Sequence, residues 1–220
     1  MSIYMPEERQ YELAPAGTHV ATCRLVVDIG TQEGQYGKKR QLVFGWELPD
    51  ELTEEDNEPF RIYRRYTYTS DRRSALRTDI ESWLGRVLTA DDFGRLDLTE
   101  MLGRTCMIGI KHETRQDGRA VSSIASIMAP PRGTPARRPV IGEAISFSLE
   151  DRPLRLPEFE PRERWISELI QKSPEHARAT GAKPAAGSPA ERLRAHLATP
   201  AEKPAPKPEP DSDLDDEIPF

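Results

Sequence analysis

Three side chains between residues 61 and 65 have types and spacing suited to binding a nucleic acid. Arg61, Tyr63 and Arg65 alternate with other residues, so on a β-strand they share one face. On such a face the two cations contact phosphates and the ring stacks on a base, the combination that single strands require. The same alternation is typical of a solvated strand face with a cross-strand tyrosine pair, and the residues alone do not separate the two interpretations.

Two further groups of cations are predicted to lie in or beside loops near this strand. One group is Tyr36 with Lys38, Lys39 and Arg40, and the other is Arg115 with Arg119. Although the formal net charge is −6, a cluster of cations on one surface is sufficient for phosphate contact. We therefore predict a DNA-binding surface formed by these residues together with the three at 61–65.

The last six residues combine acids with a stiff apolar end. They are Asp215, Asp216, Glu217, Ile218, Pro219 and Phe220. Pro219 fixes its own φ and biases Ile218 toward extended backbone, which gives a short apolar hook with a free carboxylate. Such a hook suits a small apolar pocket rimmed by Lys or Arg. We predict a protein-docking segment here, and a plain solvated tail is the alternative.

This hexapeptide resembles the acidic tip of bacterial single-stranded DNA-binding proteins. In that family an OB-fold domain binds single strands, a disordered linker follows, and the tip recruits replication and repair enzymes. The resemblance implies the same organisation here. A looser resemblance, over residues 66–70 and 81–86, is to phage and prophage proteins considered OB-like single-strand binders. Outside the tip the sequence is not close to the housekeeping bacterial protein, so the tetramer of that protein is not implied and the oligomeric state stays open.

Alternating hydrophobicity predicts three strands in the first 70 residues. The first covers residues 18–29, with the odd positions from His19 to Ile29 buried. A glycine-containing connection over residues 30–37 leads to the second strand, residues 40–48, which Pro49 ends. An acidic loop, residues 50–58, precedes the third strand, residues 60–69, with Phe60 and Ile62 in the core.

A helical insert and two more strands are predicted to follow. Leu76, Ile80, Trp83 and Leu84 form one stripe of a helix, with Asp71 or Ser74 as the N-cap and Gly85 as the terminator. Thr89 and Asp92 resemble a capping box for a second short helix, and Gly103 ends the insert. The fourth strand contains Cys106, Ile108 and Ile110. A turn at residues 113–119 leads to the fifth strand, residues 120–128, whose apolar spacing indicates a bulge.

Three strands, a helical insert and two strands are the order of the OB-fold, a five-stranded Greek-key barrel. That fold binds oligonucleotides across strands two and three and the adjoining loops, where the cations and rings above fall. We therefore expect a mainly β protein in which residues 16–130 form an OB-like barrel with a helical insert between strands three and four. Residues 1–15 are expected to be an N-terminal arm.

The rest of the chain is predicted to contain one helix and a disordered acidic tail. Residues 131–174 read as a linker with a strand near residues 144–149 and a helix at residues 162–172. We expect the helix to dock on the barrel, because so short a segment cannot bury a core of its own. Residues 175–210, rich in Ala, Pro and Lys, are predicted to be disordered, and residues 211–220 are the docking tip.

Composition agrees with a partly unfolded protein in the cytoplasm. Apolar residues make up 36% of the 220, mean hydropathy is −0.67, and most of the 20 prolines lie beyond residue 129. The sequence contains neither an apolar run long enough to cross a membrane nor a signal-peptide pattern. Cys23 and Cys106 are expected to be buried thiols, as in a cytosolic protein.

Signals for catalysis are weak. The four histidines are scattered without metal-ligand spacing, and we expect no catalytic residue, metal or cofactor. A nuclease site built from dispersed acids is a minor alternative. We expect a single-stranded DNA-binding protein of phage or mobile-element type that coats single strands. Its tip is expected to recruit host or phage enzymes of replication, recombination and repair. The alternative is an adaptor that binds no DNA and uses its tip to capture or block host enzymes.

Overall fold

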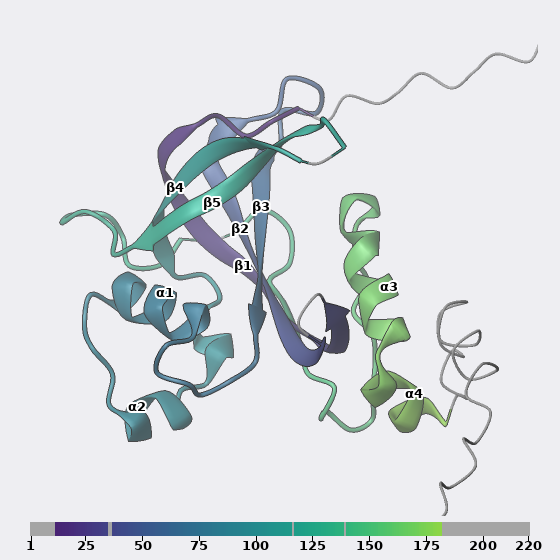
Figure 1. Ribbon diagram of the computed structural model, residues 1–220. Helices are drawn as coiled ribbons and strands as arrows, with labels where there is room; N and C mark the ends of the chain where they lie inside the picture. Colours follow the sequence, from purple (N-terminus) through teal and green to yellow (C-terminus); the bar gives the residue numbers. More distant parts are fainter. Residues whose placement is uncertain (1–11, 35–36, 116, 139, 182–220) are drawn as a thin grey trace, which may run out of the picture. The chain divides into compact units, whose positions relative to one another are not determined.

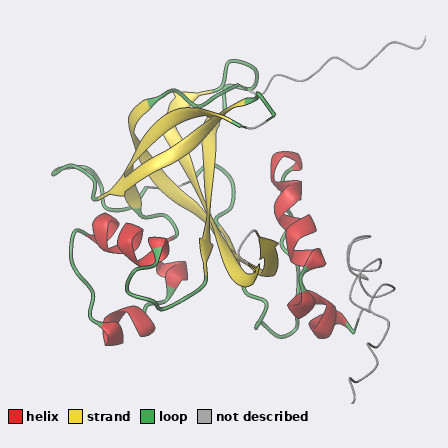
Figure 2. Ribbon diagram, in the orientation of Figure 1, coloured by secondary structure: helices red, strands yellow, loops and turns green. Residues whose placement is uncertain are grey.

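The computed structural model describes residues 12–34, 37–115, 117–138 and 140–181. Its strands are β1 (Gly17–Gly34), β2 (Gly37–Leu52), β3 (Pro59–Thr67), β4 (Thr105–Thr114), β5 (Ala120–Met128) and β6 (Ile145–Phe147). They form one sheet in the antiparallel order β3-β2-β1-β4-β5 (Figures 1 and 2). The short β6 pairs in parallel with β1. The prediction of a mainly β fold is confirmed. Among the described residues β3 and β5 make no hydrogen-bonded pairing, so the sheet is not closed.

Two groups of helices accompany the sheet. The insert between β3 and β4 holds α1 (Ala75–Leu84), α2 (Ala90–Gly94) and the 3-10 helix η1 (Leu98–Met101). After β6 come the 3-10 helix η2 (Pro161–Glu163), α3 (Arg164–Lys172) and α4 (Pro174–Thr180). Figure 1 shows the two groups on opposite sides of the strands. No helix in the described part of the chain is both long and apolar enough to cross a membrane.

The local signals of the helical insert are confirmed. The Ser74 hydroxyl accepts a hydrogen bond from the Arg77 amide, which makes Ser74 the N-cap of α1. Gly85 ends that helix with a φ of 65°, a conformation that glycine adopts without strain. Thr89 and Asp92 form both hydrogen bonds of the predicted capping box at α2.

The first strand buries both faces, and the prediction that only its odd positions are buried is wrong. Ala21 and Cys23 point into one core, but Leu25, Val27 and Ile29 point into another. Both faces are buried because a core covers each of them. The odd residues change from one core to the other at a β-bulge, where the pairing with β2 shifts between Cys23 and Leu25. The apolar odd positions continue without interruption on both sides of this bulge, so counting with a period of two did not detect it.

The connection between the first two strands is much shorter than predicted. β1 continues to Gly34 and β2 begins at Gly37, with these two residues paired across the hairpin. The second strand also runs past Pro49, which the sequence predicted to end it. Proline is tolerated there because the ladder between β2 and β3 is irregular from Leu48 to Leu52, so its missing N–H falls outside regular pairing.

Two hydrophobic cores lie on opposite faces of the sheet. The first joins the inner faces of β1–β5 to the helical insert, with Phe44, Trp46 and Trp83 in ring contact. It also contains both cysteines, which are buried free thiols as predicted. The second packs the outer faces of β1 and β2 against residues 145–180, which we call the C-terminal segment. Ile166 and Ile170 of α3 are fully buried there against Val27 and Val43.

The C-terminal segment contains more structure than predicted. A strand occurs near residues 144–149 as expected, but α4 extends into residues that were predicted to be disordered. Ser173 and Pro174 end α3 and also begin α4. The Ser173 hydroxyl accepts a hydrogen bond from the backbone N–H of His176, and Pro174 lies in the first turn of α4. The predicted bulge in the fifth strand is present, because Gly109 pairs with Ser126 and Ile110 with Ile124, leaving Ala125 unpaired.

Candidate nucleic-acid interface

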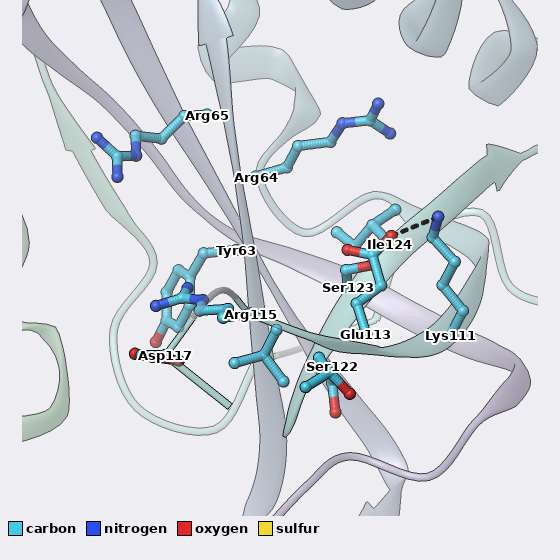
Figure 3. Close-up of a pocket in the computed structure, with 12 residues that line it drawn as sticks. Tyr63, Arg64, Arg65, Lys111, Glu113, Arg115, Asp117, Ser122, Ser123 and Ile124 are labelled. Carbon is cyan, nitrogen blue, oxygen red and sulfur yellow. Dashed lines mark ion pairs between the residues drawn. The ribbon is translucent and has the colours of Figure 1, made fainter. Parts of the chain in front are cut away.

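An open groove of about 1110 Å³ lies between β3 and the hairpin of β4 and β5 (Figure 3). β3 and β5 are the two ends of the strand order, and the curled sheet brings these edges near each other without pairing them. The groove fills the space that remains between them. It is lined by Tyr63, Arg64, Arg65, Lys111, Glu113, Thr114, Arg115, Asp117, Val121, Ser122, Ser123 and Ile124.

Strand geometry places cations around this groove. Tyr63 and Arg65 extend from one side of β3 and Arg64 from the other, as alternation requires (Figure 3). Lys111 lies near the end of β4, and Arg115 lies in the turn after it. The Asp117 carboxylate stabilises the turn by accepting a hydrogen bond from the backbone N–H of Arg119, and Gly118 has the positive φ, 83°, that the turn requires.

The groove is positively charged although the chain is acidic. Four cations line it against two acids, Glu113 and Asp117. Lys111 forms an ion pair with Glu113, and the hydrogen bond from Lys111 lowers the pKa of that carboxyl. Arg64 pairs with Asp79 at 3.0 Å. The exposed side chains of Arg65 and Arg115 have no carboxylate partner among the described residues, so both are available to bind an anion.

Three of the predicted binding residues, Tyr63, Arg65 and Arg115, meet at this groove. Sequence reasoning missed Arg64 and Lys111. Arg64 was overlooked because it alternates with the core residues Ile62 and Tyr66, yet at the sheet edge its long side chain reaches the groove. For Lys111 the only signal was its position where the buried alternation of β4 ends.

The alternation of Arg61, Tyr63 and Arg65 predicted an open face on β3. In the structure the C-terminal segment covers part of this face. The Arg61 side chain is only 9% exposed and forms an ion pair with Glu160 of the C-terminal segment. The Tyr63 hydroxyl donates to a Glu163 carboxylate oxygen at 2.8 Å, and the Tyr63 ring meets Trp165 edge-on. Burial, followed by the neighbouring Glu163 carboxylate, raises the pKa of Tyr63. Arg61 and Tyr63 therefore attach the C-terminal segment to the sheet.

A second cation strengthens this attachment. Arg24, at the bulge in β1, bonds to the fully buried Glu163 and, at 2.9 Å, to Glu160. Hydrogen bonding from Arg61 lowers the pKa of Glu160. Two arginines and two glutamates thus join strands β1 and β3 to η2 across 99 or more residues of sequence.

The remaining predicted residues lie outside the groove. Arg40 is paired with Asp28 and, at 2.8 Å, with Glu150, so two carboxylates already balance its positive charge. The hydrogen bond to Asp28 raises the pKa of Arg40. Lys38 and Lys39 are exposed at the start of β2, opposite Glu33 and Gln32. Arg119 is exposed after the turn at Gly118. Tyr36 and the tip residues Asp215, Asp216, Glu217, Ile218, Pro219 and Phe220 fall outside the described residues.

The described ranges hold no cluster of three or more His, Cys, Asp or Glu side chains arranged to bind a metal ion. Comparison with models of known protein families and with curated proteins finds no match to this chain.

Proposed function

We propose that this chain is a single-stranded DNA-binding protein that holds the strand in the groove between β3 and the β4–β5 hairpin. The observation that carries the proposal is the excess of cations in this groove beside the Tyr63 ring, two of them without a carboxylate partner among the described residues. Single strands are bound by positively charged grooves that follow the phosphates and by aromatic side chains on which bases stack. Four cations in one concave place on an acidic chain favour an anionic ligand there.

The proposed architecture is an OB-like barrel that is incompletely closed. In its support, five antiparallel strands follow the order β3-β2-β1-β4-β5, the helical insert separates β3 from β4, and the edges of β3 and β5 approach each other. The OB-fold binds oligonucleotides near strands two and three and the loop between strands four and five. The groove adjoins the last two of these places, β3 and the β4–β5 turn.

Binding of a fluorescent oligo-dT to a chain that ends at residue 181 tests the proposal. We expect saturable binding that weakens steeply with salt, because phosphate contacts release counterions. A duplex of equal length is expected to compete poorly. Failure of this chain to bind oligo-dT at low salt would contradict the proposal and favour the adaptor function.

We further propose that the terminal hexapeptide, Asp215–Phe220, recruits enzymes of replication and repair. Burial of a Phe side chain contributes about 1.5–3 kcal/mol, so Phe220→Ala should weaken partner binding by about one to two orders of magnitude. Adding one residue after Phe220 keeps the ring but displaces the carboxylate by about 3.5 Å, and it should weaken binding similarly. Anisotropy of the labelled decapeptide with purified bacterial repair enzymes measures this. Equal affinity of the wild-type, Phe220→Ala and extended peptides would contradict this proposal and would mean that the hexapeptide is a plain acidic tail.

A further inference from the structure

We propose that helix α3 forms a second wall of the binding site, with Trp165 stacking on a base and Arg164 contacting a phosphate of the strand that leaves the groove. The inference rests on the proposed function and extends it to a part of the chain outside the sheet. It starts from Tyr63, which lines the groove and also contacts α3.

Tyr63 connects the groove to Trp165. The two ring centroids are 5.6 Å apart and the ring planes are nearly perpendicular, at 85°. Tyr63 is held in place because its ring covers Gly45 on the paired strand: a Cβ at residue 45 would lie only 2.9 Å from Tyr63 Cδ1. Trp165 therefore lies one ring beyond the groove.

Trp165 differs from the other tryptophans of the chain in its exposure. Trp46 and Trp83 are 1% and 3% exposed inside the first core, whereas Trp165 packs on the second core and stays partly exposed. Its neighbour Arg164 is exposed, and the described residues provide no carboxylate partner for its side chain. A partly exposed aromatic ring next to a cation can bind one nucleotide, because the base stacks on the ring and the cation contacts the phosphate.

Helix α3 stays in place when DNA binds. Releasing the C-terminal segment would expose its buried side chains Ile145, Phe147, Leu149, Ile166 and Ile170. It would also separate the carboxylates of Glu160 and Glu163 from Arg24 and Arg61. Breaking so many contacts at once amounts to unfolding the second core, so the helix acts as a fixed wall.

The test uses the full chain, with labelled oligo-dT and intrinsic tryptophan fluorescence. Because Trp165 alone among the tryptophans is partly exposed, oligo-dT should quench fluorescence in the wild type, and Trp165→Phe should abolish the quenching. Trp165→Leu should weaken binding by about 5- to 150-fold, the range for losing one stacked base. Arg164→Gln should lower the affinity and reduce the log–log salt slope by about 0.7.

The matched control is Leu169→Ala, which trims another partly buried side chain of α3 from the same core without removing a ring. We expect it to leave the affinity for oligo-dT within about twofold. An equal loss in Leu169→Ala and Trp165→Leu would mean that only helix docking matters and would overturn the inference. Tight binding of oligo-dT without quenching would also overturn the inference about α3, but it would still be consistent with binding in the groove. Absence of any binding would refute both proposals.

Discussion

Tyr63 is held by three different contacts. Its ring covers Gly45, its edge meets Trp165, and its hydroxyl donates to Glu163, which is fully buried. A buried carboxylate that loses a donor keeps the cost of its desolvation, so the hydroxyl contributes more than its single hydrogen bond suggests.

Removing only that hydroxyl should therefore destabilise the protein. We expect Tyr63→Phe to lower the free energy of unfolding by about 1–3 kcal/mol, measured by urea denaturation. Tyr68 is the control, because it is 49% exposed and no hydrogen bond of its hydroxyl occurs among the described residues. Tyr68→Phe should change stability by less than about 0.5 kcal/mol. Equal changes in the free energy of unfolding for the two substitutions would show that the Tyr63–Glu163 hydrogen bond does not stabilise the protein.

Glu160 makes stability depend on pH in a predictable direction. Hydrogen bonding from Arg61 lowers the pKa of Glu160 in the folded chain, so folding favours its ionised form. This stabilisation is fully present above the unfolded pKa of about 4.3 and is lost as the pH falls through the lower folded value.

The comparison that isolates this effect is between wild type and Glu160→Gln. The difference in their unfolding free energies should be largest near neutral pH and should narrow as the pH falls below about 4. Urea denaturation at a series of pH values measures it. Glu158→Gln serves as the control, because Glu158 is exposed and has no ion pair in the described part of the chain. A constant difference across the series would contradict the account.

Elements defined by local contacts were predictable from the sequence, but the individual partner residues of distant contacts were not. Ser74, Gly85 and the pair Thr89–Asp92 act within one helical turn, so their residue types sufficed. The partner of Arg61, Glu160, lies 99 residues away, and period-2 alternation cannot reveal which segment covers a face. For the same reason the sequence did not reveal that the C-terminal segment contacts Arg61 and Tyr63.

Helix α3 is expected to be part of the cooperative fold and not an accessory. Ile166 is 0% exposed, and Ile→Ala substitutions at such positions cost about 2–5 kcal/mol. We expect a loss in this range for Ile166→Ala in one transition that tryptophan fluorescence and far-UV circular dichroism report alike. Gln171→Ala, on the exposed side of the same helix, should cost less than about 0.5 kcal/mol. An early separate transition of the fluorescence would mean that α3 unfolds independently.

At the scale of the whole molecule, charge is distributed unevenly. The chain carries a formal charge of −6, yet the groove has four cations to two acids. Several other cations are neutralised by specific acids: Arg24 and Arg61 by Glu160 and Glu163, and Arg40 by Asp28. Two exposed cations with no carboxylate partner among the described residues, Arg65 and Arg115, lie where the sheet does not close. An open edge between β3 and β5 is therefore the feature on which the proposed function depends.

The most direct test of that claim is the salt dependence of oligo-dT binding when two groove cations are removed. Arg65 and Arg115 are exposed and without a carboxylate partner among the described residues, so replacing both with Gln should leave the fold intact. We predict lower affinity and a log–log salt slope reduced by about 1.4, or 0.7 for each lost phosphate contact. Arg95→Gln, at the C-cap of α2 and outside the groove, should retain the wild-type slope. An unchanged slope and affinity in the Arg65→Gln/Arg115→Gln chain would contradict the assignment of the groove.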